Sequence, residues 1–563
     1  MTSAKESIGR FVHICQEKGI SKVVFSPGSR NAPLIIAFTS NDSFSCINIP
    51  DERVAAFFAL GMALKLREPV ILCCTSGSAL LNYAPAVVEA FYQRVPLLIL
   101  SADRPIEWID QGAGQTMRQR DAFDRYILGG YEFIQEPSDY DEFWYNDRIA
   151  SEAIDLCNGL PQGPVHINVP FREPLYDTIA ELSTLPKVIH TMRAIPSLNA
   201  EDCSRILNSW QSHNRVLVLC GQMDYEERLS QLLEQLSDEQ GVVVLSEMTS
   251  NVRGRGIIQC IDRTIEGIGD DDLESFCPTL LISIGGAIVS KRIRFLLRKM
   301  KITEHWLIDE TEKHIDTYQS LTLNVPIAPV TFFEMIVRGT GQGQRKEFSN
   351  TWHDLAKESA LKHERFLAGC PWSDLKAMKA ILQALPDNSS VHAANSTPVR
   401  YIQLFEQRFD INYYSNRGVS GIDGCTSTAA GHAFVIDGIV TLITGDIAFF
   451  YDSNALWHHH IPPNFRIILI NNGGGSIFRY IPGPSQTPVL ETQFEAAHST
   501  NAKGLAASYD VQYAQAHDEQ ELVAALADLY RESDTNQVRL LEVFTPNTVN
   551  DKVLRNYFEE LRT

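Results

Sequence analysis

The stretch ITGDIAFFYDSNALWHHHIPPNFRIILINNGGGSIF, residues 443–478, decides the fold class. An apolar strand is expected to end at Gly445-Asp446, a helical segment follows, and a second apolar strand ends at Asn471-Asn472. Two strands joined by a helix form a βαβ unit, in which both strands end at the same edge of a parallel sheet. The stretch therefore predicts a parallel α/β sheet whose carboxyl edge carries Asp446 and the Asn-Asn-Gly-Gly turn.

The same spacing is also typical of a metal site. Asp446, the side-chain oxygen of Asn472 and a Gly backbone carbonyl could converge on one hard cation, which takes oxygen ligands and keeps waters or phosphate oxygens as well. An Asp after a strand and an Asn-Gly turn are equally common at a plain junction of strand, loop and helix. Spacing alone leaves both interpretations open.

Short runs rich in Val, Ile and Leu recur along the chain between longer segments of helical period, which include 53–66 and 79–92. This pattern is typical of βα units around buried parallel strands. We expect fourteen strands in three series: 22–26, 46–49, 69–75, 95–101 and 165–169; 216–220, 242–246, 280–284 and 306–309; 391–394, 411–415, 439–444, 467–470 and 540–544.

Linkers divide these series into domains. Residues 171–190 carry Pro and mixed polarity, and residues 339–350 are Gly-rich and polar, which places boundaries near 185 and 345. The fold prediction is three doubly wound α/β domains with parallel sheets. The first and third are similar in size and pattern, which favours a duplication.

Composition excludes several classes of partner. The chain has 563 residues with 49 Lys and Arg against 69 Asp and Glu, a formal net charge of −20, which disfavours binding to nucleic acid or anionic membranes. No run reaches the ~18 apolar residues of a membrane span. The N-terminus lacks the apolar core of a signal peptide, so we expect a cytoplasmic protein. The eleven cysteines never form C-x-x-C, so neither zinc ligation nor a disulfide framework is expected.

Two polar stretches follow expected strands of the first series. Glu52 opens the helix expected at 53–66, and the segment Thr75-Ser76-Gly77-Ser78 lies between an apolar strand and the next helix. Acidic and small polar residues at such positions commonly cap helices, and for each stretch alone capping is the simpler interpretation. Binding of a ligand to the free amides is the alternative.

Together, these features resemble the thiamin-diphosphate enzyme superfamily. Its metal-diphosphate motif is normally Gly-Asp-Gly followed by Asn-Asn, whereas Ile447 stands at the third position here. Longer strings resemble one family, the 2-succinyl-5-enolpyruvyl-6-hydroxy-3-cyclohexene-1-carboxylate synthases of menaquinone biosynthesis, over nearly the whole chain. These strings are FSPGSRNAPL (25–34), PDERVAAFFALG (50–61), SADRPIEWIDQGAGQTMRQ (101–119), NSTPVR (395–400), YSNRGVSGIDGCTSTAAG (414–431) and NNGGGSIF (471–478).

The resemblance implies an activity and a set of cofactor residues. It implies decarboxylation of 2-oxoglutarate and 1,4-addition of the four-carbon unit to isochorismate, with thiamin diphosphate and Mg²⁺, for which Mn²⁺ can substitute. Residues 1–185 would form the pyrimidine-binding domain, 186–345 a central domain, and 346–563 the diphosphate and magnesium domain. Glu52 would activate the cofactor and Ile422 would hold it bent. The implied cofactor positions are Glu52, Ser76, Gly77, Asn82, Gly418, Ile422, Asp446, Asn472 and Gly474, of which the last three would also bind the metal.

The resemblance also implies a basic substrate site. Both substrates are dianions, and arginine binds carboxylates well because its planar fork can bind both oxygens and stays charged. An apolar wall beside the acceptor ring would consist of Ile477, Phe478 and Ile481. The implied polar substrate-binding residues are Ser29, Arg30, Arg104, Gln115, Lys291, Arg292, Ser396, Arg400 and Arg417.

The assembly implied by the resemblance is a homodimer or homotetramer with active sites between subunits, where Glu52 of one chain faces Asp446 of another. Two alternatives remain open at this point. One is another thiamin-diphosphate decarboxylase or carboligase with a different acceptor, which would have no reason for the arginines of SPGSR and SNRG. The other is a non-catalytic regulatory paralogue. Loss of Glu52 or Asp446 would indicate such a protein, but both residues are present.

Overall fold

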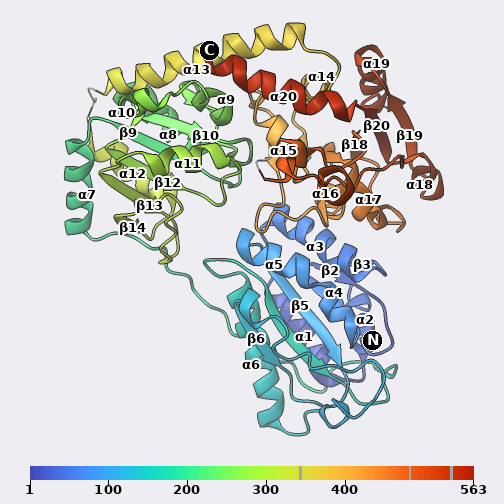
Figure 1. Cartoon of the computed structure of the whole chain (residues 1–563). Coiled ribbons are helices and arrows are strands. Elements are labelled where there is room, and N and C mark those ends of the chain that lie inside the picture. Colours follow the sequence, from blue (N-terminus) through green and yellow to red (C-terminus); the bar gives the residue numbers. More distant parts are fainter. Residues whose placement is uncertain (342–344, 481–482, 533–536) are drawn as a thin grey trace. The chain divides into compact units, whose positions relative to one another are not determined.

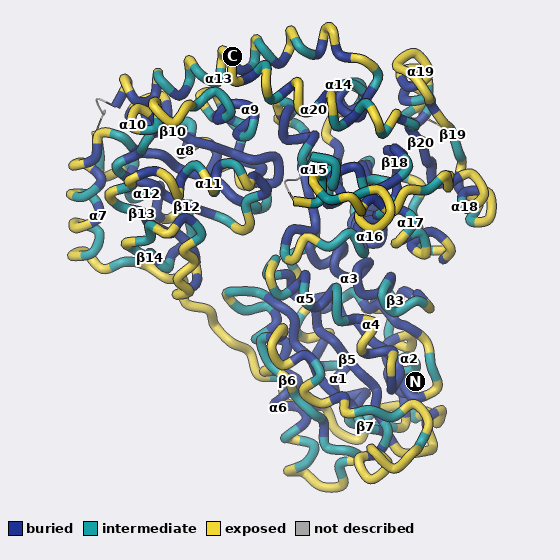
Figure 2. Tube along the Cα trace, in the orientation of Figure 1, coloured by how far each residue is buried: buried dark blue, intermediate teal, exposed yellow. Residues whose placement is uncertain are grey.

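The computed structural model describes residues 1–341, 345–480, 483–532 and 537–563 (Figure 1). In these ranges it contains three six-stranded parallel sheets flanked by helices, and one two-stranded antiparallel sheet of β1 (Thr2–Ser3) and β8 (Thr178–Ile179). The predicted α/β fold is therefore confirmed. The central strands of each sheet are almost fully buried, as Figure 2 shows. This burial is the physical reason for their continuous Val, Ile and Leu runs.

The strands of each sheet have the following bounds. The first sheet has β2 (Lys22–Phe25), β3 (Ser45–Asn48), β4 (Val70–Cys74), β5 (Leu97–Asp103), β6 (Gly129–Glu132) and β7 (Val165–Pro170). The second has β9 (Val216–Cys220), β10 (Val243–Ser246), β11 (Ile257–Ile258), β12 (Leu280–Ile284), β13 (Glu304–Ile308) and β14 (Leu323–Val325). The third has β15 (Ser390–Ala393), β16 (Asn412–Tyr414), β17 (Val440–Gly445), β18 (Phe465–Asn471), β19 (Gln512–Ala516) and β20 (Arg539–Phe544).

The first and third sheets share one topology. Their strand orders are β3-β2-β4-β5-β7-β6 and β16-β15-β17-β18-β20-β19, which are identical when the strands of each sheet are numbered along the chain. The second sheet has the different order β11-β10-β9-β12-β13-β14. In each doubly wound sheet the strand order reverses at one point, and ligands bind outside the carboxyl ends of the strands there.

All fourteen predicted strands overlap observed ones. Within the described residues six strands were not predicted: β1 and β8 of the small antiparallel sheet, and four short edge strands of the parallel sheets. These four are β6, β11, β14 and β19. Each of these strands has a neighbour on only one side and lacks the long apolar run that is typical of a central strand. The helix predicted at 79–92 is interrupted at Tyr83 into α4 (Ser78–Asn82) and α5 (Ala84–Gln93), because Pro85 has no N–H to continue the hydrogen bonding.

Residue contacts divide the described chain into two compact units. The first contains 1–193, 416–440 and 451–465, and the second contains 194–415, 441–450 and 466–563. Two segments of the third strand series thus fold with the first sheet. The predicted domain boundaries at 185 and 345 lie between the sheets and stay predictions. None of the helices in the described ranges is long and apolar enough to cross a bilayer.

In the second unit, a long helix and an edge strand connect the second and third sheets. Helix α13 (Lys346–Gly369) packs against α9 (Ile261–Ile265) and α10 (Leu273–Phe276) of the second sheet region and against α20 (Asn547–Arg562) of the third, as Figure 1 shows. The side chain of Asn251 pairs with edge strand β16, accepting from Tyr413 N at 2.8 Å and donating to Tyr413 O at 2.9 Å.

In the first unit, helices α3 (Glu52–Leu66) and α16 (Cys425–Phe434) are in backbone contact. A Cβ added at Gly61 would lie 1.9 Å from the carbonyl oxygen of Thr428, and one added at Gly431 would lie 2.0 Å from that of Phe58. Helix α3 is buried from Val54 to Leu64, which explains why its sequence is apolar on all sides. Only glycine permits this approach at these two positions.

Gly61→Ala tests this contact. Because the new methyl group would overlap the Thr428 carbonyl, the helices must separate, and we expect destabilisation of about 1–3 kcal/mol. Gly504→Ala is the control, since Gly504 lies on α18 (Lys503–Ser508) with open space around it. The control should change stability by about 1 kcal/mol at most, in the stabilising direction. Urea unfolding of both variants measures the difference, and equal midpoints would contradict the role given to Gly61.

Candidate active site

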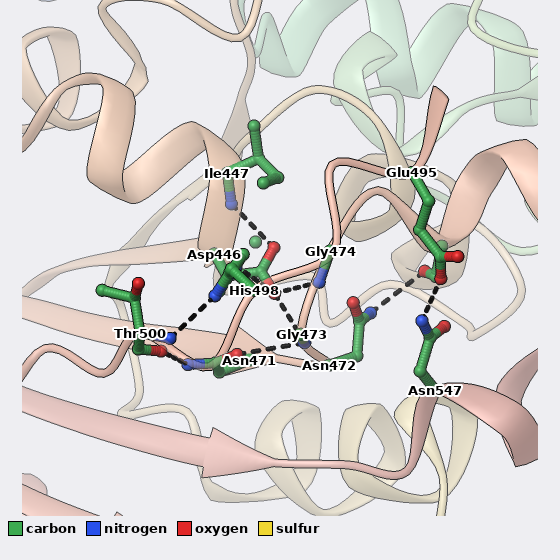
Figure 3. Close-up of polar contacts among 12 residues, drawn as sticks. Asp446, Ile447, Asn471, Asn472, Gly473, Gly474, Glu495, His498, Thr500 and Asn547 are labelled. Carbon is green, nitrogen blue, oxygen red and sulfur yellow. Dashed lines mark hydrogen bonds and ion pairs between the residues drawn. The ribbon is translucent and has the colours of Figure 1, made fainter. Parts of the chain in front are cut away.

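Asp446 holds the loop after β18 at the carboxyl edge of the third sheet. It begins α17 (Asp446–Tyr451), and its Oδ2 accepts hydrogen bonds from the backbone N–H groups of Gly473 and Gly474, each at 2.9 Å (Figure 3). Its Oδ1 accepts from Ile447 N at 2.7 Å. Burial raises the pKa of this carboxyl, while the backbone donors oppose the rise. The structure thus brings together the residues that the βαβ spacing predicted to be neighbours.

Asn472 presents one free acceptor at this site. Its Nδ2 donates to Asp374 Oδ2 and to Ser476 Oγ, both at 3.0 Å, which fixes the orientation of the amide. Its Oδ1 is buried and accepts no hydrogen bond from any residue in the described ranges. A buried acceptor left without a donor is costly unless a ligand or cation completes it.

The donor set fits a hard cation. It consists of the Asp446 carboxylate, the Asn472 Oδ1 and the Gly474 carbonyl, all oxygen, which suits Mg²⁺. Gly474 has a φ of +152°, and a Cβ there would lie 2.8 Å from the Glu495 carbonyl, so the loop requires glycine. These are the residues that would hold the magnesium ion implied by the family resemblance.

Two residues behind this loop were not predicted. Asp374 begins α14 (Asp374–Ala384), and it accepts from Thr545 Oγ1 at 2.5 Å as well as from Asn472; burial raises its pKa to about 6. His498 lies with its Nε2 3.4 Å from Asp446 Oδ2, and its backbone N–H donates to Gly473 O at 3.0 Å. Neither residue belongs to a local motif, and only chain folding brings them to the loop.

The first compact unit carries the predicted cofactor residues Glu52, Ser76, Gly77 and Asn82. Glu52 is the first residue of α3 and is only partly buried; Asn82 Nδ2 lies 3.5 Å from its Oε2. The hydroxyl of Ser76 is buried and has no hydrogen-bond partner within the described ranges. The Gly77 backbone N–H donates to Gln119 Oε1 at 2.8 Å. Glu52 thus stays partly exposed to solvent in the single chain.

Arg30 and Arg104 follow the carboxyl ends of β2 and β5 in the first sheet, and the charge of Arg104 acts on Arg30. Arg30 is 4 % exposed; it donates to the Phe171 carbonyl at 3.0 Å and forms an ion pair with Glu173 at 3.1 Å. Burial, and next the nearby positive charge of Arg104, lower the pKa of Arg30. Ser29 and Gln115 are exposed. Two neighbouring cations are suited to an anionic ligand.

A buried hydrogen-bond network supports the loop that carries Arg104 and Gln115. Gln119 Nε2 donates to Ala102 O at 3.1 Å and to Asn168 Oδ1 at 3.0 Å, and Asn168 Nδ2 donates to Asp103 Oδ2 at 3.0 Å. Burial raises the pKa of Asp103 to about 6. The network ties the loop to Gly77 through Gln119. Sequence analysis missed Gln119 and Asn168, because their partners lie on other elements.

In the second unit, the predicted basic residues differ in their surroundings. Arg292, on α11 (Lys291–Lys299), forms an ion pair with Glu266 and lies 3.9 Å from the centroid of the Phe558 ring, while Lys291 is exposed. Arg400, on α15 (Thr397–Ile402), is partly buried. It donates from Nη1 to the carbonyl of Ser396, and burial lowers its pKa.

The predicted apolar wall follows the metal loop. Ile477 is buried, and the Phe478 ring lies 5.8 Å from that of Phe494, centroid to centroid. Ile481 falls outside the described residues. The remaining predicted residues, Arg417, Gly418 and Ile422, belong to one loop of the first unit.

Comparison with known proteins identifies the family. The family described as "Thiamine pyrophosphate enzyme, N-terminal TPP binding domain" matches residues 9–123, and "Middle domain of thiamine pyrophosphate" matches residues 195–391. Proteins named 2-succinyl-5-enolpyruvyl-6-hydroxy-3-cyclohexene-1-carboxylate synthase match almost end to end. The one from Flavobacterium psychrophilum is 44% identical over 550 residues, which cover 98% of both chains. The chain belongs to this synthase family.

More distant members of the synthase family also match over their whole length. The proteins of that name from Porphyromonas gingivalis and Bacteroides thetaiotaomicron are 40% and 35% identical, over 99% and 100% of this chain and 97% and 100% of theirs. The family predicted from the SPGSR, SNRG and NNGG strings is therefore confirmed. The roles of individual site residues stay predictions.

Asn472→Asp tests the predicted magnesium site. A carboxylate is a stronger ligand than an amide, but one of its oxygens would face Asp374 Oδ2 where Nδ2 now donates. We therefore expect Mn²⁺ affinity, measured by electron paramagnetic resonance with thiamin diphosphate present, to fall about tenfold or more.

The double variant Asn472→Asp/Asp374→Asn is the matched control, because the new amide at 374 can donate to the new carboxylate. It should recover most of the lost affinity. A higher Mn²⁺ affinity in the single variant would contradict the orientation assigned to Asn472.

Proposed function

We propose that this protein decarboxylates 2-oxoglutarate and adds the resulting four-carbon unit, in a 1,4 sense, to isochorismate. The product would be 2-succinyl-5-enolpyruvyl-6-hydroxy-3-cyclohexene-1-carboxylate, an intermediate of menaquinone biosynthesis. The observation that carries this proposal is full-length membership of the synthase family, together with a loop in which Asn472 keeps a free acceptor, Oδ1, and the next residue, Gly473, donates to Asp446. Thiamin diphosphate and Mg²⁺, or Mn²⁺ in its place, are the cofactors of the proposed reaction.

The cofactor residues would have two tasks: binding the metal with the diphosphate, and activating and supporting the rest of the cofactor. Asp446, Asn472 and the Gly474 carbonyl would hold Mg²⁺ and, through it, the diphosphate. Glu52 would share a proton with the aminopyrimidine ring, while Ser76, Gly77, Asn82, Gly418 and Ile422 would support the bound group. When bound, thiamin diphosphate supplies the electron sink for decarboxylation and for the addition.

Local positive charge supports the choice of substrates. The chain has a net charge of −20, so the protein as a whole repels dianions. Arg104 is nevertheless near enough to Arg30 for its charge to lower the pKa of Arg30, and Arg400 is partly buried on α15. In such sites guanidinium groups form charge-assisted hydrogen bonds to carboxylates, which are about twice as strong as neutral ones. We infer that these arginines, with Arg417, bind the substrate carboxylates.

The proposal extends to assembly and location. We infer a homodimer or homotetramer in which Glu52 of one chain faces Asp446 of another, since Glu52 is only partly buried in the single chain. The cytoplasmic location expected from the sequence stays a prediction.

Turnover by the purified protein tests the activity. We expect 2-oxoglutarate to be consumed with isochorismate only when both thiamin diphosphate and Mg²⁺ are present. Removal of the metal with a chelator should abolish the reaction, and excess Mg²⁺ should restore it. Product formation is followed by mass spectrometry. Robust turnover in the absence of the diphosphate would overturn the proposal.

Glu52→Gln tests the proton-sharing role. An amide keeps the shape of the side chain but not its charge, so kcat should fall about 10²-fold or more while Mg²⁺ affinity is retained. The readout beside kcat is hydrogen exchange at the thiazolium carbon, followed by NMR. Asp51→Asn is the control, because Asp51 is the adjacent carboxylate and caps α3 by accepting from Val54 N at 3.2 Å. Equal kcat values for Glu52→Gln and the unmodified protein would remove Glu52 from the mechanism.

A further inference from the structure

Glu89 is a buried carboxylate that binds two consecutive backbone N–H groups. It lies on α5 and is 2 % exposed. Its Oε1 accepts from Gly418 N at 2.6 Å, and its Oε2 accepts from Val419 N at 2.7 Å. The two bonds attach a helix of the first sheet to a loop more than three hundred residues later in the chain. Both segments belong to the first compact unit.

The charge of Glu89 strengthens this attachment. Hydrogen bonds to an ionised acceptor are about twice as strong as neutral ones. Burial raises the pKa of Glu89, but the two backbone donors, Gln93 and the positive charge of Arg417 all oppose that rise. Gln93, one turn later on α5, donates to Oε1 and holds the carboxylate in place. A residue placed only for packing would not need this set of donors.

Gly418 is shaped for contact with the same helix. A Cβ at this position would lie 2.6 Å from the backbone carbonyl of Glu89 and 3.0 Å from its carboxyl carbon. Any side chain at 418 would push the loop away from α5 and lengthen both hydrogen bonds. The close approach of the loop to α5 therefore requires glycine at position 418, in the SNRG string.

A cavity of about 230 Å³ borders the loop and is lined by Phe57, Val88, Glu89, Asn416, Val419 and Asp423 among others. The loop is next anchored at Gly424, where a Cβ would lie 2.1 Å from the Phe57 ring. Between these anchors, the side chain of Val419 is 48% exposed. Asn416 Nδ2 fixes the start of the loop by donating to Thr428 Oγ1 at 3.0 Å, and Glu89 holds the backbone at Gly418 and Val419.

We propose that Glu89 is a positioning residue, which fixes the loop 416–423 and thereby Arg417 and Ile422. This inference rests on the proposed function, in which Ile422 supports thiamin diphosphate and Arg417 binds a substrate carboxylate. Glu89 itself touches the loop backbone rather than the reacting molecules. Its effect on catalysis passes through the placement of the two neighbouring side chains.

Glu89→Gln tests the proposal with two readouts. The amide can accept one of the two N–H groups, but its own NH₂ faces the other, so the loop should be released. Arg417 is 8 % exposed, which protects the bond after it from trypsin. We expect trypsin to cut the full-length variant between Arg417 and Gly418 at least tenfold faster than the unmodified protein. The Kd for thiamin diphosphate at saturating Mg²⁺ should rise at least tenfold.

Asp147→Asn is the matched control for the loss of a buried carboxylate. Asp147 lies on α6 (Tyr140–Cys157) in the same compact unit, is 4 % exposed and binds Arg10 instead of the loop. Asp147→Asn should leave both readouts within twofold of the unmodified protein.

Gly418→Ala perturbs the contact between Glu89 and the loop from the loop side, and it replaces Glu89→Gln as the test variant if Glu89→Gln does not fold. It should reproduce the faster cleavage, which is the readout used for this variant because Gly418 is itself a predicted cofactor residue.

The outcomes separate this inference from the proposed function. If the unmodified protein binds thiamin diphosphate and turns over, yet Glu89→Gln shows unchanged cleavage and Kd and Gly418→Ala shows unchanged cleavage, the role of Glu89 is overturned. Cleavage that rises equally in Asp147→Asn would also overturn it, because general destabilisation would then explain the effect. Failure of the unmodified protein to bind the cofactor would overturn the proposed function, whereas the cleavage readout would still report on the loop.

Discussion

The backbone contact between α3 and α16 is the constraint on which the first compact unit depends. Because Gly61 and Gly431 have no side chains, the two helices approach until carbonyl oxygens occupy the space of a Cβ. Helix α3 begins at Glu52, and the loop 416–423 leads directly into α16. The glycine contact therefore sets the positions of two groups of predicted site residues. A looser pairing would leave both helices buried and apolar but would move these residues.

Carboxylates that accept backbone or amide N–H groups complete the site. Asp446 holds the loop of Gly473 and Gly474, Asp374 orients the amide of Asn472, and Glu89 holds the loop of Gly418. All three carboxylates are buried, and burial raises the pKa of each. Such buried polar groups are stable only when fully hydrogen-bonded, and in that state they rigidify their surroundings. The chain thus uses acidic residues to fix loops at the ends of its sheets, where glycine-rich segments would otherwise have many conformations.

Sequence patterns predicted every central strand of the three parallel sheets but only two of their six edge strands, β3 and β16. The buried strands β4, β9 and β18 show continuous apolar runs, because both of their faces are covered. The edge strands β6 and β19 read GGYE and QYAQA and carry no such signal. In the site, Asp446 and Asn472 could be placed together because a βαβ unit has only one arrangement of its strand ends. Gln119, Asp374 and Glu89 could not be found in this way, because each acts through a hydrogen bond to a distant part of the chain.

The amino-acid sequence by itself determined the parallel α/β class, the neighbourhood of Asp446 and Asn472, and the family. These follow from local period, from strand connectivity and from strings long enough to be distinctive. Only the tertiary structure decided that 416–440 folds with the first sheet, that Asn472 keeps its Oδ1 free while Nδ2 is bound, and that Glu89 holds the loop of Arg417. The physical reason is that these features depend on which polar atoms meet after burial. That outcome is set by the packing of helices and sheets far apart in the chain, and no local pattern encodes it.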